Sequence, residues 1–66
     1  MKAIINGSAR ELPGELTVGA LLELLGSPRR GVAVACNDRV VRRDEYDVAP
    51  VKDGDRLEII QAVAGG

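Results

Sequence analysis

Only one segment of this 66-residue chain has the periodicity of an α-helix, and it constrains the fold more than any other feature. Four apolar residues recur there at the i, i+3, i+4, i+7 spacing of one helical face: Val18, Leu21, Leu22 and Leu25. Thr17 is a suitable N-cap, and Gly26 followed by Pro28 is typical of a helix end. Gly19 costs such a helix about 1 kcal/mol relative to alanine, so tertiary packing must support it. The sequence therefore predicts a single helix over residues 17–26.

Five short stretches on either side of this helix read as strands. Residues 2–6 and 8–12 are joined by Asn6-Gly7, a strong hairpin signal because both central residues of a type I′ turn need positive φ. The other three are residues 32–36, 39–42 and 56–63. The order strand, strand, helix, strand, strand, strand predicts an α+β fold of the β-grasp (ubiquitin-like) type. Its mixed sheet of four to five strands would carry the helix on one face, with the first and last strands parallel in the centre.

The segments between these elements favour simple structural roles. Residues 32–36 are apolar without alternation, which predicts little solvent on either side of that strand, and Cys36 at its end is expected in the core. Asn37-Asp38 predicts a tight turn. Residues 43–47 predict a short helical turn that Asp44 could cap. Asp53-Gly54-Asp55 is too small for a calcium loop and predicts a turn. The remaining basic pairs are read as solvated loop charges, at residues 29–30 and 42–43.

The composition excludes several classes of function. Histidine is absent and Cys36 is the only cysteine, so no Ser-His-Asp or Cys-His site, structural zinc site, iron–sulfur cluster or disulfide framework can be built. The net charge of −1 argues against nucleic-acid binding. No segment resembles a signal peptide or a membrane helix. We therefore expect a cytoplasmic protein, monomeric when free, which binds no metal or cofactor and is too small to enclose a catalytic cleft.

The last residues are the least ordinary part of the sequence. Val63-Ala64-Gly65-Gly66 follows the final strand, so we expect a β-grasp domain over residues 1–63 and a flexible tail over residues 64–66. Glycine has no Cβ, which lets an extended backbone enter a narrow channel and approach a nucleotide. A free carboxylate is a poor electrophile, but joining it to AMP on a partner enzyme would open Gly66 to nucleophilic attack. Simple fraying of the terminus is the alternative.

These features together resemble the ThiS family of sulfur carrier proteins in thiamine biosynthesis. The matching segments, in chain order, are Asn6-Gly7, Thr17-Val18 with the leucine-rich helix, residues 32–37, Val40-Val41, Asp53-Gly54-Asp55 and Val63-Ala64-Gly65-Gly66. Tyr46, the only aromatic residue, stands where the family often has tryptophan. The resemblance implies that a ThiF-like, E1-like enzyme adenylates Gly66 with ATP and magnesium. Sulfur taken from cysteine by a sulfurtransferase would then give a thiocarboxylate, which the thiazole synthase ThiG accepts.

Three other interpretations stay open at this point. A MoaD-like small subunit uses the same tail chemistry to deliver sulfur for molybdopterin, although that family tends to be longer and to have prolines before its tail. A ubiquitin-like modifier would join the Gly66 carboxylate to a lysine. A β-grasp interaction module would have an inert tail.

Residues that face away from the helix are candidates for partner docking. Alternation along the strands turns one apolar set toward the helix, namely Ile5, Leu57 and Ile59. Ile4 and Ile60 then lie on the opposite, uncovered face. With Ala62 and Val63 they would form an apolar patch that aligns the tail in a partner's active site. Partial burial of these residues beneath a loop is the alternative.

Overall fold

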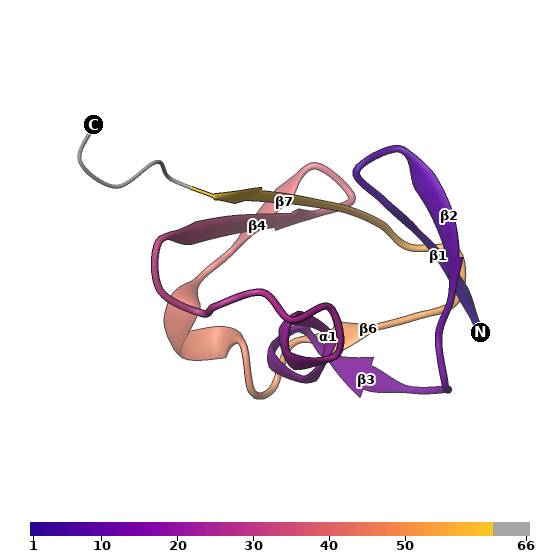
Figure 1. The fold of residues 1–66 in the computed structure, drawn as a ribbon, viewed down its shortest axis with the longest axis horizontal. Helices are drawn as coiled ribbons and strands as arrows, with labels where there is room; N and C mark the ends of the chain where they lie inside the picture. Colours follow the sequence, from indigo (N-terminus) through magenta and orange to yellow (C-terminus); the bar gives the residue numbers. More distant parts are fainter. Residues whose placement is uncertain (62–66) are drawn as a thin grey trace.

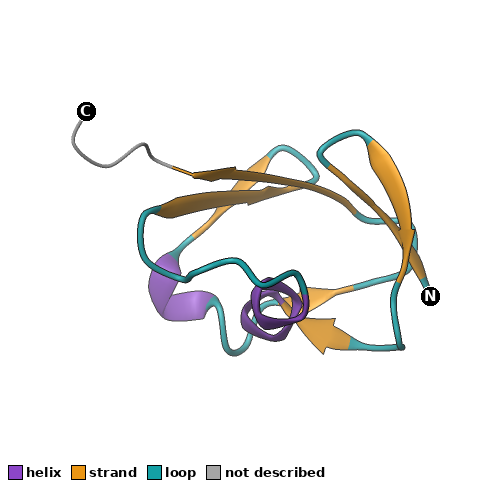
Figure 2. Cartoon of the chain, in the orientation of Figure 1, coloured by secondary structure: helices purple, strands orange, loops and turns teal. Residues whose placement is uncertain are grey.

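A computed structural model describes residues 1–61 and shows a five-stranded sheet that carries one α-helix on one face (Figures 1 and 2). The strand order is β2-β1-β7-β4-β5. Their bounds are β1 (Lys2–Ile5), β2 (Ser8–Glu11), β4 (Val32–Cys36), β5 (Arg39–Val41) and β7 (Arg56–Gln61). β1 and β7 pair in parallel at the centre, and the other pairs are antiparallel. The predicted β-grasp topology is confirmed.

The two-residue turns of the sheet form as the sequence predicts. Asn6 and Gly7 have φ values of 50° and 84°, and Asn37 and Asp38 have φ values of 52° and 69°. Positive φ at both central residues matches the right-handed twist of the flanking strands, so each turn fixes the register of its hairpin. β5 ends at Val41, one residue earlier than predicted.

The helix α1 (Val18–Leu24) is shorter than predicted but begins where expected. The Thr17 side chain caps it, because the Oγ1 atom accepts a hydrogen bond from the Ala20 N–H at 3.1 Å. The two preceding N–H groups, of Val18 and Gly19, donate to the carbonyl oxygens of Ala49 and Tyr46 at 2.9 and 2.8 Å. Three N–H groups that a helix start leaves without helical partners are therefore bonded within the chain.

A second, two-stranded sheet was not predicted. It pairs β3 (Leu16–Thr17) with β6 (Pro50–Val51) in antiparallel fashion, beside the start of α1 (Figure 1). Strands of two residues are too short to show alternation, and Pro50 reads as a loop residue. The pairing joins the entry to the helix with the segment that leads back to the sheet.

Two local predictions are wrong. β4 is not shielded on both faces, because Val34 is buried while Ala33 is exposed on the face away from α1. Asp44 does not cap the short 3₁₀ helix η1 (Arg43–Glu45). Glu45 supplies that bond instead, since its Oε1 atom accepts from the Arg42 N–H at 3.1 Å. A carboxylate three residues on reaches this N–H, as in the reciprocal half of a capping box.

The core lies between the sheet and α1 and is almost entirely aliphatic. The apolar helix face meets Ile5 and Leu57 as predicted, with Leu25 and Ile59 at its margin. The buried hydrophobic side chains are those of Ala3, Ile5, Leu12, Val18, Leu21, Leu22, Val34, Tyr46, Val51 and Leu57.

Candidate functional site

β7 leads to the predicted tail and lies in the middle of the sheet, between β1 and β4. Its last residue, Gln61, pairs with Val32 at the start of β4. Gln61 is also the last described residue. The predicted docking residues Ala62 and Val63, and the tail residues Ala64, Gly65 and Gly66, lie outside the described residues. Their roles stay predictions, and the described part shows what supports them.

Asn6 holds β7 beyond the point where β1 ends. The Ile59 N–H donates to Asn6 Oδ1 at 2.8 Å, and Asn6 Nδ2 donates to the Ile59 carbonyl oxygen at 3.2 Å. The Asn6 side chain thus bonds both backbone groups of one β7 residue, as a further strand residue would. The sequence marks Asn6 only as a turn residue, so this second role was missed.

Asp55 organises the opposite end of β7. Its Oδ2 atom accepts from the Lys52 N–H at 2.8 Å, and its Oδ1 atom accepts from Asn37 Nδ2 at 3.1 Å. Burial raises the pKa of Asp55, but these hydrogen bonds outweigh it, so the pKa lies below its ordinary value. Asp53 accepts from the Lys2 N–H at 2.7 Å. The predicted turn is confirmed, and among residues 1–61 no three metal-binding side chains gather at one place.

Cys36 has the structural role that its sequence position predicts. Its side chain is half-buried and packs against the core. Its Sγ donates to Asp55 Oδ2 at 3.6 Å. Burial raises the pKa of the thiol, and the Asp55 carboxylate raises it further, so the unreactive protonated form is favoured. Cys36 pairs with Leu57, at the far end of β7 from Gln61.

The uncovered face of the sheet, defined by Ile4, Val40 and Ile60, exposes three large apolar side chains. Their exposed fractions are 39%, 72% and 64%. The predicted position of Ile4 and Ile60 is confirmed, and burial beneath a loop is excluded for Ile60. We did not predict Val40 as part of this face from the sequence. In the structure, Ala35 pairs with both Val40 and Glu58, and this places Val40 on the same face as Ile60. Scattered apolar residues are ordinary on a surface, but three on one face mark a candidate docking surface.

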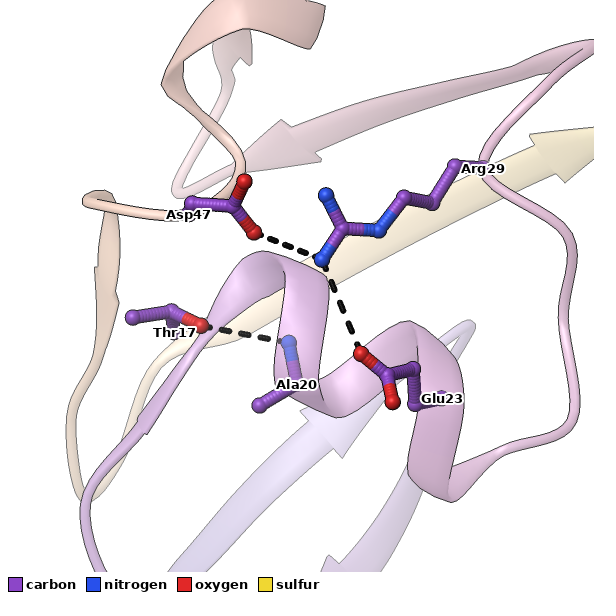
Figure 3. A network of polar contacts seen from close by, with 5 residues as sticks. All are labelled: Thr17, Ala20, Glu23, Arg29 and Asp47. Carbon is purple, nitrogen blue, oxygen red and sulfur yellow. Dashed lines mark hydrogen bonds and ion pairs between the residues drawn. The ribbon is translucent and has the colours of Figure 1, made fainter.

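The basic pairs are only partly the solvated charges that the sequence predicts. Arg30 and Arg43 are exposed and form no ion pair with another described residue. Arg42 pairs with Asp44 at 3.2 Å. The prediction is wrong for Arg29, whose guanidinium lies against α1 and pairs with Asp47 and Glu23 (Figure 3). A Cβ atom on Gly19 would overlap Arg29 Nη2, so this placement depends on the glycine at that position.

Tyr46 ties the segment after η1 to the start of β4. The side chain is buried, and its hydroxyl donates to the Val32 carbonyl oxygen at 3.4 Å. A buried aromatic ring with a bonded hydroxyl is a stable anchor. Val32 therefore pairs with Gln61 and also accepts a hydrogen bond from Tyr46.

Among residues 1–61 no helix has the length and hydrophobicity needed to cross a bilayer.

Comparison with known proteins gives the same family from sequence and from structure. The family model described as "ThiS family" matches residues 3–66. The chain is 35% identical to the sulfur carrier protein ThiS of Escherichia coli over the full length of both chains. It is 36% identical to that of Thermus thermophilus, covering 94% of this chain and 95% of the relative. The crystal structure of the thiamine biosynthesis protein ThiS from Geobacter metallireducens superposes with a TM-score of 0.86, at 33% identity and full coverage of both chains.

A longer relative matches over the whole of this chain. It is the thiazole synthase of Paramagnetospirillum magneticum, which is 44% identical over 66 residues. The chain spans only 20% of that protein's length. The family model, the two carrier relatives and the structural match agree, and the chain belongs to the ThiS family.

Proposed function

We propose that this protein carries sulfur as a thiocarboxylate on Gly66 and donates it to thiazole synthase in thiamine biosynthesis. The observation that carries the proposal is the family match, which runs to Gly66 and so includes the Gly65-Gly66 end. The relatives from Escherichia coli and Thermus thermophilus, matched over nearly their whole length, are named sulfur carrier proteins. The working group is thus the backbone carboxylate of the last residue, and the chain is a protein cosubstrate of its partners.

The proposed cycle begins with adenylation. A ThiF-like enzyme uses ATP and magnesium to join the Gly66 carboxylate to AMP, which converts a poor electrophile into an activated acyl group. The persulfide that a sulfurtransferase forms with sulfur taken from cysteine then displaces AMP and gives an acyl disulfide. A thiol cleaves the S–S bond of this acyl disulfide, which releases the thiocarboxylate and leaves the thiol oxidised as a disulfide. The absence of side chains at Gly65 and Gly66 supports both steps, because the backbone can approach the nucleotide closely. The proposed cycle assigns no part to Cys36, which pairs with Leu57 at the far end of β7 and whose thiol pKa is raised by burial.

The uncovered face would dock the partner while the tail reaches the active site. Ile4 and Ile60 lie on this face with Val40, and Ala62 and Val63 are proposed to extend it. Ile60 lies on β7, the strand that leads to the tail, so a partner docked at this residue would have the Gly66 carboxylate only six residues further along the chain. The ThiS-like segment within the Paramagnetospirillum thiazole synthase supports thiazole synthase as one partner. We place these reactions in the cytoplasm and expect the free carrier to be a monomer.

Reconstitution with a ThiF-like enzyme, ATP and magnesium tests the proposal. Mass spectrometry should detect the acyl adenylate on the wild-type chain, and the thiocarboxylate after addition of a sulfurtransferase, cysteine and a thiol reductant. Deletion of Gly66 should abolish both species, whereas Arg30→Ala should leave both intact. Absence of an adenylate on wild-type protein would contradict the proposal. Rescue of a knockout by thiazole supports it, rescue only by a molybdopterin precursor favours a MoaD-like role, and conjugates on lysines favour a modifier.

A further inference from the structure

Arg29, in the loop between α1 and β4, is the side chain whose placement the proposed function does not yet explain. Its Nη2 atom lies 2.6 Å from Asp47 Oδ1 and 3.6 Å from Glu23 Oε2 (Figure 3). The side chains of Asp47 and Glu23 are 73% and 74% exposed. Ion pairs this exposed contribute little to stability by themselves. The significance of Arg29 therefore rests on which segments it joins.

Gly19 is what allows the guanidinium to lie against the helix. A Cβ atom at this position would overlap Arg29 Nη2, and it would lie 2.9 Å from Asp47 Oδ1. Gly19 is buried, and its N–H donates to the Tyr46 carbonyl oxygen at 2.8 Å. Glycine is unfavourable inside a helix, so alanine would be preferred here on helix propensity alone. The geometry gives the glycine a reason, which is room for the guanidinium of Arg29.

The Arg29 contact continues to the end of β7 through a short series of neighbours. Asp47 follows Tyr46, whose hydroxyl donates to the Val32 carbonyl oxygen at 3.4 Å. Val32 is three residues after Arg29 in the chain and pairs with Gln61. Residues 62–66 are covalently attached to Gln61. The loop before β4 and the segment after η1 are thus joined by the Arg29–Asp47 ion pair and by the Tyr46–Val32 hydrogen bond. Both contacts lie close in the fold to Gln61, the residue before the tail segment 62–66.

We propose that Arg29 is a positioning residue for the reactions at Gly66, and that Gly19 is glycine in order to admit it. Arg29 bridges α1 and Asp47, which holds the start of β4 in place, and the start of β4 holds the end of β7. The inference rests on the proposed function for its consequence at Gly66. Its structural part, that Arg29 restrains the Val32–Gln61 pair, is tested independently of that function.

The first experiment compares Arg29→Ala with Arg30→Ala, which removes the neighbouring exposed arginine. Arg29→Ala should speed amide hydrogen exchange in residues 29–33 and 59–61, with exchange in β1 and β2 unchanged. With the ThiF-like enzyme, kcat for adenylation should fall about tenfold, because a small misplacement of a reacting group slows the chemical step. KM should stay constant, because the uncovered face is untouched. A merely structural role would lower the melting temperature without this split. Equal behaviour of the two alanine variants would overturn the proposal.

The second experiment is a double-mutant cycle of Gly19→Ala and Arg29→Ala. Alone, Gly19→Ala should reproduce the fall in kcat and the faster exchange, because the new Cβ displaces the guanidinium. In the Arg29→Ala background it should cause no further fall in kcat, and it should raise the folding equilibrium constant about fivefold through helix propensity. A gain in stability with unchanged kcat in the wild-type background would overturn the proposal. If wild-type protein is not adenylated at all, the proposed function fails, and hydrogen exchange still decides whether Arg29 holds this end of the sheet.

Discussion

The two faces of the central sheet are built from the same strands but differ in burial and in role. Leu57 and Ile60 are three residues apart on β7, yet Leu57 is fully buried against α1 and Ile60 is 64% exposed. The same contrast holds on β1, where Ile5 is buried and Ile4 is 39% exposed. Alternation along a strand separates the residues that stabilise the fold from those that are free to contact a partner. A chain of this size can therefore hold a core and a docking surface on one sheet.

Leu57→Ala should have the largest effect on stability. Leu57 is fully buried beneath α1, and removal of its side chain leaves a cavity that a small domain cannot refill. We expect the free energy of unfolding to fall by about 2–5 kcal/mol, measured by urea denaturation. Ile60→Ala is the matched control on the opposite face and should lower it by less than about 1 kcal/mol. Equal losses would break the distinction between the faces.

Asn6→Ala should have an intermediate effect on stability, because an exposed side chain can still form hydrogen bonds that the fold requires. Asn6 is exposed, but its side chain bonds both the N–H and the carbonyl oxygen of Ile59. Loss of these bonds, together with the poorer fit of alanine to the positive φ of this turn position, should lower the free energy of unfolding by about 1–3 kcal/mol. Ser8→Ala, at an exposed position across the same turn, is the control. A loss no greater than that of Ser8→Ala would remove Asn6 from the account.

Ile60→Asp should separate binding from folding. The side chain is on the uncovered face, so the stability change should stay within about 1 kcal/mol, the range of strand propensities. A charge on the proposed docking surface should raise the dissociation constant for the ThiF-like enzyme about tenfold or more, by calorimetry. Ile60→Thr keeps a β-branched side chain and controls for the strand. An unfolded Ile60→Asp protein would place this residue in the core and contradict the comparison.

Lowering the pH should have the smallest effect on stability. It acts through Asp55, beside the end of β7 that is farthest from Gln61. The pKa of Asp55 is lowered in the folded protein, so its contribution is present above the ordinary carboxyl value of 3.8 and is lost as pH falls through the folded value. The free energy of unfolding should therefore decline as pH drops below 3.8, and less steeply in Asp55→Asn. Glu58→Gln, on β7 three residues further along the chain, is the control. Identical pH curves for wild type and Asp55→Asn would show that the hydrogen bonds of Asp55 contribute nothing.

Local patterns in the sequence predict most of the fold. The Asn-Gly turn, the spacing of the leucines in α1 and the alternation in β7 each report a periodicity or a required φ, and all three were confirmed. The β3–β6 pair and the capping of η1 were not predictable in the same way. Two-residue strands have no period, and Glu45 caps by reaching back along a turn whose shape depends on its surroundings.

The candidate site was predictable to the same extent: residues placed by strand alternation were found from the sequence, and residues placed by distant contacts were not. Strand parity was enough to place Ile4 and Ile60 on the uncovered face. The second role of Asn6 and the ion pairs of Arg29 depend on residues distant in the chain, Ile59 and Asp47, which no local pattern connects. For Gly19, helix propensity suggests only a cost, and the tertiary contact supplies the reason.

Mass spectrometry of the intact protein, isolated from cells grown without thiamine, tests the central claim most directly. We expect a fraction in which one oxygen of the Gly66 carboxylate is replaced by sulfur. That fraction should disappear in cells without the ThiF-like enzyme and accumulate in cells without thiazole synthase. Two results together would contradict the proposed function. The Gly66 carboxylate would stay unmodified under all three conditions, and cells in which Gly66 is deleted would still grow without thiamine.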